Sequence, residues 1–157
     1  MISSKEELSA KVLLVDEKPN NLIALEKLLK GLPLEIYRAY NGNDALALTL
    51  KNDFALVLLD VQMPQIDGFE VATRIRSNPK TSTVPIIFVT AIITDPKYVS
   101  KGHKVGAVDY LTKPIDPAIL KAKVSVFCEL FYQRKETSKL LLEENKLIRN
   151  ELGKETN

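Results

Sequence analysis

The sequence has few of the residues that form cross-links or metal centres: its 157 residues include one cysteine, one histidine and no tryptophan. Because Cys128 is alone, no disulfide can form within the chain, and a reducing cytoplasm is the expected environment. His103 and Cys128 are too few to supply the soft ligands of a zinc or copper site. No apolar run is long enough to cross a membrane, and the first ten residues contain no apolar core of a signal peptide.

An excess of charge of one sign is also missing. The chain has 22 Lys and Arg residues against 20 Asp and Glu residues, which leaves a formal net charge of +2. With no basic excess and no acidic block, neither a nucleic acid nor a membrane surface is an expected partner. The length is sufficient for one domain with a real core and one additional element.

Short apolar runs alternate with segments of helical periodicity. The runs predict strands over residues 11–15, 34–38, 55–59, 86–89 and 108–111. Helices are expected over residues 19–30, 45–50, 69–78, 96–104 and from 117 onward, with Asp44 and Asp116 as capping residues and with Pro19 and Pro117 in first turns. The alternation predicts an α/β fold, a doubly wound parallel sheet covered by helices on both faces.

Polar side chains follow four of the predicted strands: Asp16 with Glu17, then Asp60, Thr90 and Lys113. The carboxyl ends of parallel strands meet at one edge of a sheet, where such folds bind their ligands. Three carboxylates crowded there repel one another and raise their pKa values unless a cation neutralises them. Hard oxygen donors favour Mg²⁺ or Mn²⁺. A magnesium site beside a lysine and a hydroxyl is suited to phosphoryl transfer, with a carboxylate as the nucleophile.

These residues lie in motifs that resemble the receiver domain of two-component response regulators. The motifs are Asp16-Glu17, LLDVQMPQIDG around Asp60, FVTA around Thr90 and DYLTKP around Lys113, and the resemblance covers roughly residues 11–122. Four separated motifs in the right order make the resemblance specific. It implies a flavodoxin-like sheet of five parallel strands in the order 2-1-3-4-5.

The resemblance also implies a role for each acidic residue. Asp60 corresponds to the aspartate that accepts a phosphoryl group. Asp16, Glu17, Asp60 and the backbone carbonyl of Gln62 correspond to the groups that bind Mg²⁺. The second acid of the pair is usually Asp in this family, so the longer side chain of Glu17 is a departure at a small ion with strict geometry.

The remaining implied roles concern the switch. Lys113 corresponds to the lysine that pairs with the phosphoryl group, Thr90 to the hydroxyl that moves toward it, and Tyr110 to the aromatic switch residue. The peptide bond before Pro114 is expected to be cis. Phosphorylation would then alter the face formed by the fourth helix, the fifth strand and the fifth helix.

The implied function is a phosphoacceptor signalling switch, rather than an enzyme, that receives its phosphoryl group from a sensor histidine kinase or a phosphotransfer protein. A Mg²⁺-dependent aspartyl phosphatase is one alternative, but such enzymes need a second Asp as general acid where this chain has Gln62. A flavin-binding protein would need a phosphate-cradling loop where Asp16 and Glu17 repel phosphate. A docking module that is never phosphorylated is a third alternative.

The C-terminal part of the chain shows no helix stop between residues 127 and 152. Steps of four and three residues predict a heptad seam that includes Phe127, Phe131, Leu141, Asn145, Ile148 and Leu152, with Arg134 and Ser138 between them. Asn145 favours a two-stranded coiled coil, so a homodimer is expected. The alternative is a solvated helical linker. We therefore divide the chain into an N-terminal arm (1–10), a receiver domain (11–126) and a helical extension (127–157), which resembles connectors to kinase, PAS or cyclic-dinucleotide domains.

Overall fold

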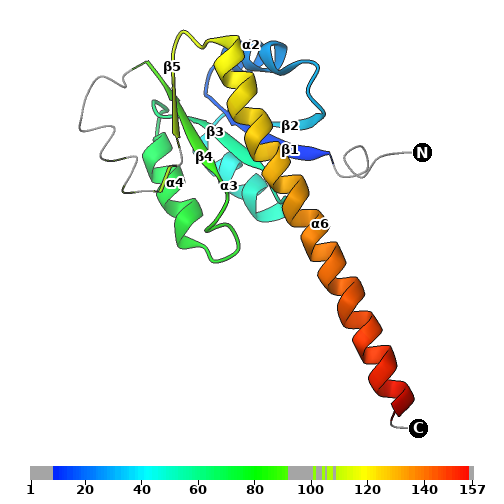
Figure 1. Ribbon diagram of the computed structural model, residues 1–157. Helices are drawn as coiled ribbons and strands as arrows, with labels where there is room; N and C mark the ends of the chain where they lie inside the picture. The colour runs from blue at the N-terminus through cyan, green and yellow to red at the C-terminus, as the bar shows by residue number, and fades with distance from the viewer. Residues whose placement is uncertain (1–8, 92–100, 102–103, 105, 108, 156–157) are drawn as a thin grey trace.

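The computed structural model describes residues 9–91, 101, 104, 106–107 and 109–155. Five parallel strands form one sheet in the order β2-β1-β3-β4-β5 (Figure 1). The strands are β1 (Ala10–Val15), β2 (Leu34–Ala39), β3 (Leu56–Asp60), β4 (Ile86–Thr90) and β5 (Asp109–Thr112). This architecture confirms the predicted flavodoxin-like fold and its strand order, with strand ends within a residue or two of those expected.

Helices pack on both faces of the sheet. They are α2 (Pro19–Leu29), α3 (Gly42–Lys51), α4 (Gly68–Ser77) and α6 (Pro117–Glu155). α2 and α6 share one core with the sheet, and α3 and α4 share the other. The helix expected over residues 96–104 lies outside the described residues, apart from single positions. Among the helices that are described, none combines the length and the apolarity needed to cross a membrane.

β3 is buried on both faces because its side chains alternate between the two cores. Leu56 and Leu58 join the core under α2 and α6, whereas Val57 and Leu59 join the core under α3 and α4. All five residues of β3 are buried, as an unbroken apolar run predicts for a central strand. The strand therefore carries Asp60, its last residue, to a fixed position at the edge of the sheet.

The predicted cap of α3 is wrong. The capping residue is Asn41, whose side chain accepts a hydrogen bond from the backbone N–H of Asp44 at 2.8 Å. Asp44 lies in the first turn and accepts a bond from the Asn41 amide at 3.0 Å. An Asn three residues earlier is an equally good acceptor for the free N–H groups of a first turn, so α3 begins at Gly42. The expected cap of α6 is confirmed, because Asp116 accepts a bond from Ala118 N at 2.8 Å.

α6 is one continuous helix of 39 residues that packs on the domain and then projects away from it (Figure 1). Its contacts with the domain continue past residue 126. The Tyr132 hydroxyl accepts a hydrogen bond from Ala10 N at 3.2 Å and donates one to Pro33 O at 2.9 Å. Lys135 forms an ion pair with Asp53. From residue 136 to residue 153 every side chain is exposed.

Candidate functional site

The carboxyl ends of the strands bring the predicted acidic residues to one edge of the sheet. In the sheet register, Val15 pairs with Leu59 and Asp60 pairs with Val89. Asp16 follows Val15 and Asp60 follows Leu59, so the two carboxylates lie at the same level on neighbouring strands. The structure thus brings these two residues together, as the motif spacing predicts.

Asp60 is a buried carboxyl group with only 8% of its surface exposed. Its Oδ1 accepts a hydrogen bond from the backbone N–H of Gln62 at 3.2 Å. Burial, together with the negative charge of Asp16, raises the pKa of Asp60 to about 6, while Lys113 and the bond from Gln62 act in the opposite direction. The ionised form of Asp60 is therefore destabilised in the folded protein, and a cation bound at this edge would reduce that destabilisation.

Asp16 is buried, and its carboxylate interacts with three nitrogen groups. Its Oδ1 accepts a hydrogen bond from Lys18 N at 2.9 Å, and its Oδ2 accepts one from the side-chain amide of Asn21 at 2.9 Å. The Lys113 ammonium lies 3.5 Å from the same Oδ2. Lys113 therefore links the first and last strands of the site. The motifs did not indicate Asn21, although a hydrogen-bonding residue in the first turn after an acidic pair was a visible signal.

Glu17 is exposed and lines an open hollow of about 370 Å³ beside Asp60, together with Val61, Gln62, Met63, Pro64 and Asp67. In the described part of the chain, no three side chains of Asp, Glu, His or Cys stand close enough together to hold a metal ion. The donor chemistry nevertheless fits Mg²⁺, because Asp16, Glu17 and Asp60 supply hard carboxylate oxygens at the same edge of the sheet. Glu17 has to turn toward the two aspartates to join them.

Gly68 sets how closely α4 approaches the site. A Cβ atom at this position would lie 2.3 Å from the backbone oxygen of Asp60 and 2.9 Å from the Cα of Val61. The Gly68 N–H donates to Val61 O at 2.9 Å. Only glycine lets the first turn of α4 pack against the end of β3. The sequence motif contained Gly68, but this steric requirement appears only in three dimensions.

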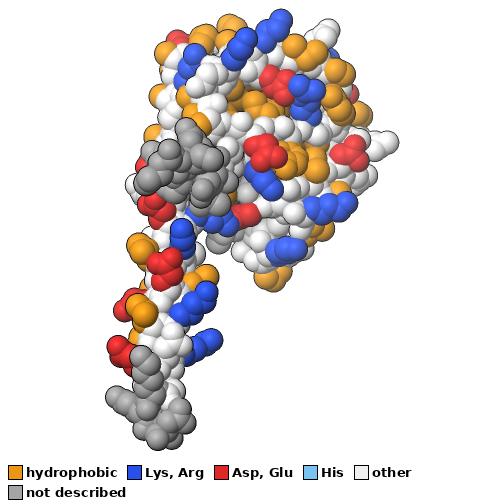
Figure 2. Space-filling model, turned by 90° about the vertical axis from the view of Figure 1, so that its right-hand side faces the viewer, with side chains coloured by type: hydrophobic (Ala, Val, Ile, Leu, Met, Phe, Trp, Pro, Cys, Tyr) orange, Lys and Arg blue, Asp and Glu red, His pale blue; other side chains and the backbone are white. Residues whose placement is uncertain are grey.

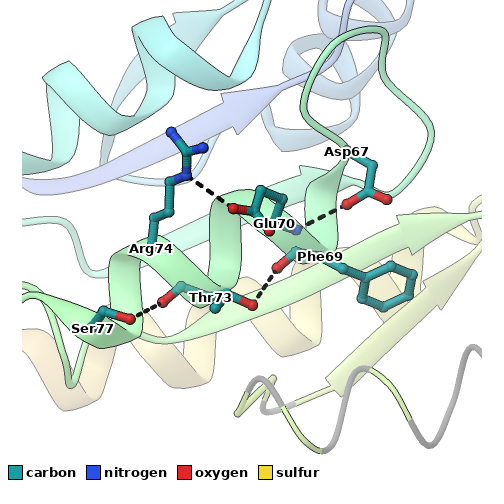
Figure 3. A network of polar contacts seen from close by, with 6 residues as sticks. All are labelled: Asp67, Phe69, Glu70, Thr73, Arg74 and Ser77. Atoms are coloured by element: carbon teal, nitrogen blue, oxygen red, sulfur yellow. Dashed lines mark hydrogen bonds and ion pairs between the residues drawn. The ribbon is translucent and has the colours of Figure 1, made fainter.

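The first turns of α4 are stabilised by their own polar side chains (Figure 3). Asp67 caps the helix by accepting a hydrogen bond from Glu70 N at 2.9 Å. Glu70 forms an ion pair with Arg74 one turn later, at 3.1 Å. The Thr73 hydroxyl donates to Phe69 O at 2.9 Å. These contacts fix the helix start that lies over the loop after Asp60.

The remaining predicted residues lie on the other side of Asp60. Thr90 is buried at the end of β4, and its backbone oxygen accepts a hydrogen bond from Lys113 N at 3.0 Å. The bond between Lys113 and Pro114 is cis, as expected. Tyr110 is half-buried, and its ring centroid lies 5.6 Å from that of Phe88 on β4. Its ring thus packs against the strand that carries Thr90.

The residues predicted for the heptad seam are divided between two environments. Phe131 is buried in the core under α2 and α6, and Phe127 packs against that core. Leu141, Asn145, Ile148 and Leu152 are exposed on the projecting part of α6. The first two therefore pack within their own domain.

Comparisons with known proteins agree with this architecture. A family model described as the response regulator receiver domain matches residues 12–125. A Vibrio cholerae protein named a probable cyclic di-GMP phosphodiesterase is 34% identical over 150 residues, which make up 95% of this chain and 33% of that protein. The response regulator PleD of Caulobacter vibrioides is 37% identical over 117 residues, or 74% of this chain and 26% of that protein.

A solved structure is also similar: that of the chemotaxis response regulator CheY4 of Vibrio cholerae, with 31% sequence identity and a TM-score of 0.70 over 76% of this chain and 98% of that one. This chain spans only between a quarter and a third of the length of the two curated relatives. The family match covers well over half of the chain, and the fold and strand order agree with it. The chain therefore belongs to the family of response regulator receiver domains.

Proposed function

We propose that this chain is a phosphoacceptor switch in which Asp60 accepts a phosphoryl group from a histidine kinase or a phosphotransfer protein. One observation carries the proposal: the buried Asp60 carboxyl ends the central strand with Asp16 beside it, and Lys113 lies 3.5 Å from Asp16. Family membership supports the same reading. Consistent with its lone cysteine, we place the protein in the cytoplasm.

In the proposed reaction, a carboxylate oxygen of Asp60 attacks the phosphorus atom of the donor phosphohistidine. A P–O bond forms as the P–N bond breaks, and the donor imidazole leaves with the electron pair of that bond. Asp16, Glu17, Asp60 and the backbone carbonyl of Gln62 would hold Mg²⁺, which supplies charge neutralisation when bound. The Lys113 ammonium, near Asp16 on the same edge, pairs with the transferred group.

The new phosphoryl charge biases the residues on the β4–β5 side of the site. The Lys113 ammonium and the Thr90 hydroxyl are groups that a phosphoryl charge at Asp60 attracts, and a backbone hydrogen bond from Lys113 N to Thr90 O joins the two strand ends. Tyr110 packs beside Phe88 and changes its rotamer in the phosphorylated state. α6 follows β5 directly, so the change reaches the projecting helix. We propose that α6 connects the receiver to an output domain, because the Vibrio cholerae relative matches 95% of this chain and so extends into this helix.

The proposed role is regulatory, with self-catalysed phosphotransfer and dephosphorylation as its only chemistry. An aspartyl phosphatase would need an acid at Gln62, whose amide cannot donate and reclaim a proton. A docking module that is never phosphorylated would have no use for the buried carboxylates of Asp16 and Asp60. Both alternatives make distinct predictions: sustained turnover of small phosphate esters for the first, and no phosphoryl uptake for the second.

Acetyl phosphate tests the proposal without a known kinase. The protein is incubated with acetyl phosphate and Mg²⁺, and its intact mass is measured. We expect a gain of one phosphoryl group that is lost in the Asp60→Asn variant and when EDTA replaces Mg²⁺. An equal gain in Asp60→Asn, or no gain in the wild type, contradicts the proposal.

A further inference from the structure

α6 carries a line of large apolar side chains that belong to neither core. Each is about half exposed: Ile119 50%, Val126 56%, Leu130 47%, Leu141 55%, Ile148 49% and Leu152 57%. Three of them lie on the part of α6 that packs on the receiver, and three lie on the projecting part. We call these six residues the apolar stripe.

The spacing of the stripe is regular over the whole helix. Ile119, Leu130, Leu141 and Leu152 follow one another at intervals of eleven residues, and Val126 and Ile148 lie two such intervals apart. Eleven residues are close to three full turns of an α-helix. The stripe therefore runs nearly straight along one face of α6, over a length of roughly 50 Å from its first to its last residue.

This face differs from the predicted heptad seam in the N-terminal half of α6. The seam and the stripe share Leu141, Ile148 and Leu152, but toward the N-terminus the seam continues through Phe131 and Phe127. Those two side chains point into the core of their own receiver. A second helix that followed the seam toward the N-terminus of α6 would meet the receiver itself, whereas one that followed the stripe would find exposed apolar side chains on both sides of a polar interval between Leu130 and Leu141.

Charged side chains flank the stripe asymmetrically on the projecting part of α6. Figure 2 shows acidic side chains along one side and basic side chains along the other. By helical position, Glu144 and Glu151 border the stripe on one flank, and Arg149, with Lys146 behind it, lies on the other. All four are exposed. The two flanks therefore carry opposite charge.

We propose that a second copy of this chain covers the stripe, with the two α6 helices parallel and related by a two-fold axis from Ile119 to Leu152. This rests on the proposed function, in which α6 is the output. In a parallel pair, the acidic flank of each helix meets the basic flank of its partner, whereas an antiparallel pair sets like charges together. Glu144 precedes Arg149 by five residues, the offset at which flanking positions of parallel helices meet across the pair.

A helix pair that runs from Ile119 to Leu152 also brings the two receivers together, which a contact confined to the tail would not do. Ile119, Val126 and Leu130 lie at the level of the receiver, so the two receivers come to lie side by side along α6. A change at the β4–β5 side of each site then acts on helices that are already paired.

The first test uses Val126, which lies outside the predicted seam. Val126→Glu places a charge in the stripe at a position that is 56% exposed in the single chain, so the receiver itself keeps its fold. Sedimentation velocity over a concentration series is expected to show dimerisation weakened at least tenfold. Lys139→Glu, on the opposite face of α6, is the control and leaves the dimer within about threefold of wild type. An unchanged dimer in Val126→Glu overturns the proposal.

Cross-linking tests the two-fold geometry. In a Cys128→Ala background, Val126→Cys is expected to form a disulfide-linked dimer under mild oxidation, because residues of the stripe face their own copies across a parallel two-fold pair. Lys139→Cys is expected to remain monomeric. Cross-linking of Leu141→Cys without cross-linking of Val126→Cys would show a contact confined to the tail and overturn the proposal.

Charge reversal tests the orientation. Glu144→Arg and Arg149→Glu should each weaken the dimer severalfold at low salt, and the double variant should restore it. Failure of the double variant to recover overturns the parallel arrangement. Phosphoryl uptake from acetyl phosphate is measured on Val126→Glu in parallel. If the protein takes up the phosphoryl group normally but the wild type forms no dimer, only this inference is contradicted. If the protein takes up no phosphoryl group, the proposed function is contradicted whatever the oligomeric state.

Discussion

In the body of the domain the large apolar side chains pack into two cores, whereas the side chains of α6 from residue 136 to residue 153 are all exposed. The projecting part is nonetheless rich in large apolar residues, among them Leu140, Leu142 and Leu147 in addition to the stripe. Burial of apolar surface is the main force that stabilises a fold. The body can therefore specify its own structure, whereas the apolar surface of the projecting part of α6 is not buried within the described part of this chain.

Charged side chains are also arranged differently in the two regions. At the proposed phosphoacceptor edge, Asp16 and Asp60 are buried close together, and burial and the charge of Asp16 raise the pKa of Asp60. Along the projecting helix, acidic and basic side chains are separated onto two flanks and remain in water. Crowded carboxylates are costly without a cation nearby, while separated flanks cost little and favour one orientation of a partner. The first arrangement is suited to a switch, and the second to assembly.

The largest expected effect contrasts one buried and one exposed leucine. Leu58→Ala removes a side chain that is 1% exposed in the core under α2 and α6, and should lower the free energy of unfolding by about 3 kcal/mol. Leu141→Ala, at 55% exposure, should change it by less than about 0.5 kcal/mol at concentrations that keep the protein monomeric. Urea denaturation measures both. Equal effects would remove the distinction between the two regions.

The next prediction compares two glycines. Gly68→Ala forces a Cβ against the Asp60 backbone at 2.3 Å, so α4 must move away from β3. We expect a loss of about 2 kcal/mol in stability and slower phosphoryl uptake. Gly153→Ala has no atom within 4 Å of its Cβ and lies in a helix, so it should leave both unchanged or stabilise α6 slightly. Wild-type uptake in Gly68→Ala would show that this close approach is not required.

The pH dependence of stability follows from the raised pKa of Asp60. A carboxyl whose pKa is raised by folding binds its proton more tightly in the folded state, so its stabilising contribution is complete below its ordinary pKa and is lost as the pH rises through about 6. In EDTA, Asp60→Asn should therefore be more stable than wild type at pH 8, by up to about 3 kcal/mol, and nearly equal to it at about pH 3. A difference that does not vary with pH would contradict the cause assigned to the shift.

The smallest expected effect lies where the two regions join. Tyr132→Phe removes the hydroxyl that bonds to Ala10 N and Pro33 O, and should cost about 1–2 kcal/mol. Faster hydrogen exchange at the first residues of β1 should accompany the loss. Tyr40→Phe, at an exposed site, is the control and should change neither quantity measurably. An unaltered β1 in Tyr132→Phe would show that α6 is held by apolar packing alone.

Much of the fold and of the acidic site could be predicted from sequence because both depend on local patterns. An unbroken apolar run that ends in Asp60 indicates a central strand and places its carboxylate at the sheet edge. The alignment of Asp16 with Asp60 then follows from parallel pairing. The cis bond at Pro114 was expected from the family resemblance and is present.

Contacts that join distant segments could not be predicted in this way. Arg76 donates to Val84 O at 2.6 Å and to Gly106 O at 2.9 Å, and no motif marks it. The heptad and eleven-residue patterns of α6 share three residues, so sequence alone could not decide between them. Only the packing of Phe131 in the core shows which face of the helix is occupied. The direction in which a helix docks is a property of the whole fold.

The most direct test of whether Asp60 becomes an acyl phosphate locates the modified residue. After treatment with acetyl phosphate and Mg²⁺, borohydride reduction converts an aspartyl phosphate into homoserine, which peptide mass spectrometry can assign to a position. We expect homoserine at position 60 and at no other acidic residue of the site, Asp16 and Glu17 included. Homoserine at another position, or none in a protein that has gained a phosphoryl group, would contradict it.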